Sequence, residues 1–140
     1  KFAKKFLKKN KNCKLAVNDF NKLKVKNNSI SVCIDRGSIT HNNKKNIRLI
    51  FSEVYRTLNH KGMFISCLFS KNHYAYKKNK YLFFKKETGT KKGLITSFFN
   101  KNEIKRLFIN FKIETMIHEI NFDVISNKKY CMWFVIAKKL

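Results

Sequence analysis

A strand, a helix and a second strand follow one another over residues 30–69, and this succession constrains the fold more than any other feature of the sequence. Residues 30–35, ISVCID, are mostly apolar, which is typical of a strand buried on both faces. Over residues 43–58 apolar side chains recur at helical spacing, and residues 63–69, MFISCLF, predict another buried strand. Crossovers of this kind are right-handed and build parallel sheets, so the predicted fold class is α/β.

The connection between this helix and the second strand is expected to be a tight turn. It comprises residues 58–62, Leu-Asn-His-Lys-Gly. Glycine has no Cβ, so we predict that Gly62 takes the left-handed backbone conformation that closes the helix.

Upstream of this unit the sequence predicts two shorter elements. Residues 2–9 have an amphipathic helical pattern in which lysines surround Phe2, Phe6 and Leu7. Residues 14–18, KLAVN, predict a short strand that ends at Asp19.

Downstream, the sequence predicts a short helix and two final strands. Asn100 followed by Glu103 fits the pattern of a helix N-terminal cap. Residues 112–120 and 130–137 then predict the strands. Residues 71–93 form a long connection rich in lysine and aromatic residues; it could hold a planar anionic substrate or be a solvated segment.

The net charge of +24 attracts polyanions, so nucleic acid is a possible partner. However, 28 of the 32 basic residues are lysines, and asparagine, isoleucine and phenylalanine are abundant, as an AT-rich coding sequence produces. Arginine is the favoured residue for reading phosphates and bases, so this composition favours drift over a dedicated nucleic-acid reader.

The four cysteines, Cys13, Cys33, Cys67 and Cys131, are far apart in the sequence, which predicts neither a metal site nor a redox motif. Buried thiols in a reducing compartment are the simpler interpretation. No apolar stretch is long enough to cross a membrane and no signal peptide is recognisable, so we expect a cytoplasmic protein without a membrane partner.

Residues 34–70 resemble the middle of class I S-adenosylmethionine-dependent methyltransferases. In that family the fourth strand is followed by a loop, a helix and an L-x-x-G-G type turn before the fifth strand. The turn here is Leu58 to Gly62, with Lys61 where the family commonly has glycine. Residues 98–119 and 130–139 resemble the family's late helix and last two strands, the final one antiparallel to the rest.

The resemblance implies a Rossmann-like, mostly parallel sheet that is truncated at its N-terminus. Residues 1–140 would form a partial methyltransferase domain, from the helix after the family's second strand to its last strand. The family's G-x-G-x-G cofactor loop has no counterpart, since the only glycines are Gly37, Gly62, Gly89 and Gly93. We therefore expect this chain alone to bind cofactor poorly or not at all.

The resemblance also implies roles for particular residues. Asp19 would accept a hydrogen bond from the adenine amino group of S-adenosylmethionine, and Phe20 would pack beside the ring. Asp35 and Arg36 would face the cofactor crevice, although Asp35 could instead be a loop carboxylate paired with a lysine. His41 could take a proton from the methyl acceptor, or serve only in the loop or as a helix cap.

The expected function is methyl transfer from S-adenosylmethionine to an unidentified acceptor, which we expect to be a small molecule. Methyl transfer from a sulfonium depends on positioning, so no metal is expected. A basic nucleic-acid-binding module and a methyltransferase-like scaffold without catalysis are the alternatives.

Overall fold

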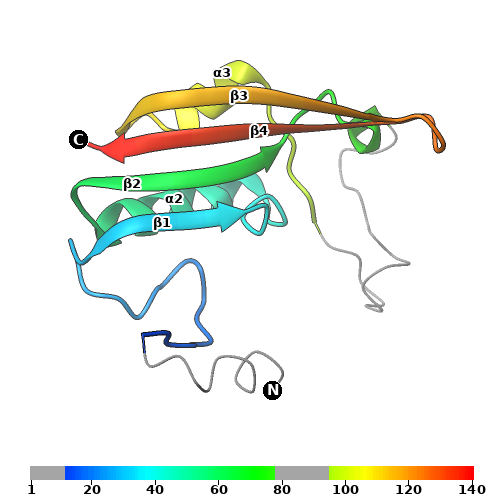
Figure 1. Cartoon of the computed structure of the whole chain (residues 1–140). Helices are drawn as coiled ribbons and strands as arrows, with labels where there is room; N and C mark the ends of the chain where they lie inside the picture. The colour runs from blue at the N-terminus through cyan, green and yellow to red at the C-terminus, as the bar shows by residue number, and fades with distance from the viewer. Residues whose placement is uncertain (1–11, 78–94) are drawn as a thin grey trace.

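The computed structural model describes residues 12–77 and 95–140, which form a four-stranded sheet with helices packed on one face (Figure 1). The predicted helix over residues 2–9 lies outside the described residues, and so does most of the connection at 71–93.

The predicted strand–helix–strand unit is present. It comprises β1 (Ile30–Arg36), α2 (Lys44–Thr57) and β2 (Leu58–Phe69), and β1 pairs in parallel with β2. Helix α2 begins where Asn43 caps it, because the Asn43 side chain accepts a hydrogen bond from the backbone of Asn46 at 2.8 Å. The periodicity of the sequence therefore predicted this unit correctly.

The second half of the chain adds a helix and a long hairpin. A 3₁₀ helix, η1 (Tyr74–Lys77), follows β2, and α3 (Lys101–Leu107) precedes β3 (Phe111–Asp123) and β4 (Lys128–Lys139). The predicted cap of α3 is confirmed as a capping box in which Asn100 and Glu103 each accept a hydrogen bond from the other's backbone N–H.

The strand order β1-β2-β4-β3 places the last strand between its two neighbours in the sheet. Strand β4 is antiparallel to both β2 and β3, so β1, β2 and β3 all run in one direction. The predicted α/β class, with an antiparallel last strand in an otherwise co-directional sheet, is therefore confirmed.

The core lies between the sheet and the two helices. Phe51 of α2 meets Phe64 of β2 and Phe108 edge-on, with ring centroids 5.2 and 4.9 Å apart. All three rings are buried, and each contributes about 1.5–3 kcal/mol relative to an exposed side chain. This aromatic contact fixes both helices to the same face of the sheet.

The opposite face of the sheet is apolar and open. In the part of the chain that the structure describes, both α-helices pack on the first face. The strand registers place Ile34, Ile65 and Ile136 in one row across this second face, and Phe134 beside Ile117 in the next. Ile34 is 69% exposed and Ile117 is 48% exposed.

The predicted strand at residues 14–18 is wrong. This segment is irregular, with Val17 fully exposed, and the only bridge near it joins Asp19 and Lys22. A strand requires a neighbour for its backbone hydrogen bonds, and none of the described residues supplies one here.

The predicted conformation of the turn is also wrong in one respect. The left-handed residue is Lys61, with φ of 62°, and not Gly62. Gly62 instead makes a close approach, because a Cβ there would lie 2.7 Å from the Asn59 side chain and 3.1 Å from the carbonyl oxygen of Ile30. Strand β2 starts directly after α2, at Leu58 rather than at residue 63, and its register with β1 shifts between the pairs Ile30–Leu58 and Val32–Met63.

Candidate functional site

The carboxyl ends of β1 and β2 lie at the same edge of the sheet, on the right in Figure 1. The loop at residues 37–43 leaves β1 there, and residues 70–77 and 95–100 come to the same end. Ligands of open α/β sheets bind outside the carboxyl ends of their strands, so this edge is the candidate site.

Asp35, at the end of β1, organises the loop that follows it. Its Oδ1 accepts hydrogen bonds from the backbone N–H groups of Ser38 at 2.9 Å and Ile39 at 3.1 Å, and its Oδ2 accepts one from the Ser66 hydroxyl at 3.1 Å. Burial raises the pKa of Asp35, and these hydrogen bonds oppose the rise. One carboxylate oxygen of Asp35 therefore fixes the loop, and the other binds strand β2.

The loop after β1 is also fastened to the strand-like segment before α3. Thr40 and Ser97 exchange two hydrogen bonds, from the Thr40 hydroxyl to the Ser97 carbonyl at 2.7 Å and from the Ser97 N–H to the Thr40 carbonyl at 2.9 Å. The Ser97 hydroxyl donates to the carbonyl of Asn42 at 2.7 Å. These contacts hold residues 40–42 in a fixed position beside the sheet edge.

His41 lies within this fastened loop. Its Nδ1 is 3.1 Å from the Thr96 hydroxyl, and its ring meets that of Phe69 edge-on at 5.7 Å. Burial lowers the pKa of His41, and the carboxylate of Asp35 partly offsets this effect. A histidine with a lowered pKa is neutral at pH 7, which is the form that can accept a proton.

Arg36 extends from the exposed side of β1, opposite Cys67 in the register. Within residues 12–77 and 95–140, no carboxylate forms an ion pair with it. Gly37 follows with φ of 84°, a conformation that glycine adopts readily and that turns the chain away from the sheet.

The segment that carries Asp19 and Phe20 is held against α2. The Arg56 guanidinium donates to the carbonyls of Val25 at 3.0 Å and Leu23 at 3.2 Å. Glu53 accepts from the Leu23 N–H at 2.7 Å and pairs with Arg56 at 2.6 Å. One ion pair on α2 therefore fixes the course of residues 23–25.

Within this segment Asp19 and Phe20 are exposed. The Asp19 Oδ1 accepts a hydrogen bond from the backbone of Asn21 at 2.9 Å, which forms a local turn. Phe20 is 47% exposed. The structure thus brings Asp35, Arg36 and His41 together at the end of β1, whereas Asp19 and Phe20 lie on a separate segment.

Two histidines near the site received no role from the sequence. The His118 Nε2 is 2.8 Å from the Ser70 hydroxyl, and its ring stacks on Trp133 at 4.2 Å. His73 is buried, with its ring 4.9 Å from that of Phe69. Ser70 and His73 follow β2 in the sequence, and this position after a strand was the one sequence feature that could have placed them near the site. His118 comes from β3, and nothing in the sequence indicates that it reaches Ser70.

The described residues suit one end of the expected cofactor only. Asp19 carries an exposed carboxylate, which can accept from an amino group, and the next residue, Phe20, carries a partly exposed ring, which can cover a planar base. Gly37 and Gly62 are isolated in sequence, so the described residues provide no glycine-rich cradle for the rest of the molecule.

The described residues contain no cluster of three or more His, Cys, Asp or Glu side chains that could hold a metal ion. Nor do they contain a helix long and apolar enough to cross a membrane.

Comparison with known proteins gives matches at the level of structure only. No protein-family profile and no curated protein sequence matches the chain. A methyltransferase from Methanosarcina mazei, described as S-adenosylmethionine-dependent, superimposes with a TM-score of 0.69 at 18% identity, covering 89% of this chain and 66% of that chain. A protein from Pyrococcus horikoshii gives a TM-score of 0.73 at 16% identity, covering 99% and 65%.

A third structure contains ligands. It is the 1,6-didemethyltoxoflavin-N1-methyltransferase of Burkholderia thailandensis with 1,6-didemethyltoxoflavin and S-adenosylhomocysteine bound, and it gives a TM-score of 0.69 at 11% identity. The match covers 99% of this chain and 56% of that one. The present chain thus spans less than two thirds of the length of each of these proteins, and its fold is that of class I S-adenosylmethionine-dependent methyltransferases.

Proposed function

We propose that this chain is the carboxyl-terminal part of a methyltransferase domain that transfers a methyl group from S-adenosylmethionine to a small-molecule acceptor. The observation that carries the proposal is the sheet order β1-β2-β4-β3 with an antiparallel β4, which superimposes on solved methyltransferases over 89% or more of the chain in the structures described above. The reducing cytoplasm is the proposed location, in keeping with four free cysteines.

Asp19 and Phe20 are the proposed adenine contacts. The Asp19 Oδ1 already accepts from Asn21, so its second oxygen is the proposed acceptor for the amino group. The exposed face of Phe20 would cover the base. The ion pair of Glu53 with Arg56 would keep this segment in place through its bonds to residue 23.

At the end of β1 the proposed roles differ from one residue to the next. Bound S-adenosylmethionine would supply an electrophilic methyl group on its sulfonium. Asp35 shapes the cofactor crevice indirectly, by fixing the loop that follows β1. Arg36 presents a positive charge to the crevice. His41, neutral because burial lowers its pKa, would accept the proton that the acceptor releases.

The test is calorimetric titration of S-adenosylmethionine into the protein in the longest form that its gene encodes. Asp19→Ala is compared with Asp123→Ala, a matched control because Asp123 is a partly exposed aspartate whose Oδ1 likewise accepts from the backbone two residues on, at 3.0 Å from Ile125. We expect binding in the wild type, about tenfold or more weakening in Asp19→Ala, and no change in Asp123→Ala.

Either of two results would count against the proposal. If the folded wild-type protein binds no S-adenosylmethionine, the methyltransferase function is wrong and a scaffold role is favoured. If both variants lose affinity equally, the effect reflects the loss of one negative charge, and Asp19 is not the adenine contact.

A further inference from the structure

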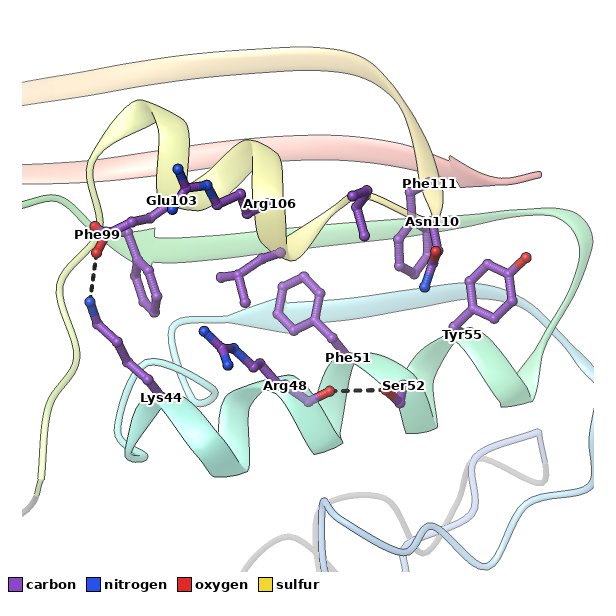
Figure 2. Close-up of a pocket in the computed structure, with 12 residues that line it drawn as sticks. Lys44, Arg48, Phe51, Ser52, Tyr55, Phe99, Glu103, Arg106, Asn110 and Phe111 are labelled. Carbon is purple, nitrogen blue, oxygen red and sulfur yellow. Dashed lines mark hydrogen bonds and ion pairs between the residues drawn. The ribbon is translucent and has the colours of Figure 1, made fainter.

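A cavity separate from the candidate site lies between α2 and α3, on the helical face of the sheet (Figure 2). Its volume is about 320 Å³, at the lower end of the range of small-molecule pockets. Aromatic side chains form much of its lining, among them Phe51, Tyr55, Phe99 and Phe111. Such a lining accommodates an aromatic ring or a short acyl chain.

Two arginines stand on opposite walls of this α2–α3 cavity. Arg48 projects from α2 and Arg106 from α3, and Figure 2 shows the two side chains directed to the same end of the cavity. Only four of the 32 basic residues of the chain are arginines, yet two of them line this space. Guanidinium groups bind planar carboxylates with two parallel hydrogen bonds, which lysine cannot do.

Neither of these guanidinium groups has a carboxylate partner among residues 12–77 and 95–140. Arg56 shows the contrast, since its guanidinium is occupied by Glu53 and by backbone carbonyls. The one carboxylate on the cavity wall, Glu103, is already bound by Lys44 at 2.7 Å and by Lys71 at 3.0 Å. The lining thus carries three cationic side chains, Lys44, Arg48 and Arg106, against one anionic side chain.

We propose that the α2–α3 cavity binds a small aromatic carboxylate, with its ring against the aromatic lining and its carboxylate between Arg48 and Arg106. A single- or double-ring compound matches the volume. Ser52, which also lines the cavity, donates its hydroxyl to the Arg48 carbonyl at 3.1 Å and is therefore engaged within α2. This site is independent of the proposed methyl transfer, because it lies on the helices and not at the strand ends.

The test uses 2-naphthoate and its neutral analogue 2-naphthalenemethanol as probes, titrated into the ¹⁵N-labelled full chain and followed by NMR. We expect the carboxylate to bind about tenfold or more tightly than the alcohol, and the largest shifts to occur in α2 and α3. Arg48→Gln/Arg106→Gln should weaken naphthoate binding by about tenfold or more.

The matched control is Lys45→Gln/Lys105→Gln. It removes two positive charges from the same two helices, but neither lysine is among the residues that line the cavity. We expect it to change naphthoate affinity by less than about twofold. A further variant, Ser52→Phe, fills the cavity without changing the charge and should abolish binding.

Three results would overturn the proposal. Equal weakening in the arginine and lysine variants would show a general charge effect. Equal affinity for naphthoate and the alcohol would show that the arginines do not recognise the carboxylate. Shifts confined to the open face of the sheet, around Ile34 and Ile65, would show that the probe binds elsewhere.

Discussion

Glu103 joins three parts of the fold, and its replacement by glutamine should destabilise the protein. The carboxylate binds Lys44 at the start of α2 and Lys71 after β2, and it completes the cap of α3. Burial raises its pKa, but the hydrogen bonds from Lys44, from the backbone of Asn100 and from Lys71 outweigh this and hold the pKa at about 2. Glutamine keeps the capping geometry and removes the charge, so Glu103→Gln isolates the ion pairs.

The magnitude follows from the shift of the pKa. A change from 4.5 to about 2 corresponds to at most about 3.4 kcal/mol of stability at pH 7. The Glu103 side chain is 25% exposed and that of Lys44 is 49% exposed, so solvent screens the pairs. We therefore expect Glu103→Gln to lower the free energy of unfolding by about 1–2 kcal/mol at pH 7.

The pH dependence gives a second, independent readout. Because the folded pKa is depressed, the stabilisation is complete above pH 4.5 and is lost as the pH falls toward 2. The difference between wild type and variant should fall to roughly half of its pH 7 value near pH 3.3. The assay is urea unfolding followed by Trp133 fluorescence; urea is chosen because guanidinium chloride would screen the ion pairs.

Glu114→Gln is the matched control. Glu114 also contacts two lysines, Lys112 at 3.2 Å and Lys138 at 3.7 Å, but these longer pairs lie on the surface of the last strand in the sheet order, where the Lys112 side chain is 65% exposed. We expect no measurable change in stability for this variant. An unchanged Glu103→Gln protein, or a destabilisation that is the same at pH 7 and pH 3.3, would refute the reasoning.

Two further predictions concern single positions. Lys61→Gly should raise the free energy of unfolding by about 0.5–1 kcal/mol, because relief of the left-handed conformation exceeds the entropy that glycine adds to the unfolded chain. The midpoint of urea unfolding measures this change, and a lower midpoint in the variant would contradict the prediction. Trp133→Phe should lower the free energy of unfolding by about 1 kcal/mol, because the buried indole N–H donates to the Phe99 carbonyl at 2.9 Å. Far-UV circular dichroism follows this variant, and wild-type stability would show that the bond contributes nothing.

The elements that were predicted correctly are specified by residues close together in the sequence. The periodicity over residues 43–58 is complete within α2 itself, and the capping box needs only Asn100 and Glu103. The strand assignment at 14–18 failed because a strand depends on a neighbour, which local sequence does not specify.

Residues of the candidate site could be predicted from the sequence only where they lie at or just after the end of a predicted strand. Asp35 and Arg36 end β1 and His41 lies in the loop that follows, so the topology alone brings them to the carboxyl ends of the strands. The contact of His118 with Ser70 joins residues 48 positions apart, through the register of β3 on β4 and of β4 on β2. Likewise, Gly62 lies close to Ile30 across the sheet, a contact that the residues of the turn do not indicate by themselves.

The open face of the sheet also has a consequence for the behaviour of the isolated chain. Apolar rows that contain Ile34 and Ile65 adjoin the outer edge of β1, and such surfaces favour pairing between copies. The net charge of +24 opposes this by mutual repulsion, and salt screens the repulsion. The isolated chain should therefore stay monodisperse at low ionic strength and self-associate as salt is added, the reverse of what salt does to a polyanion complex.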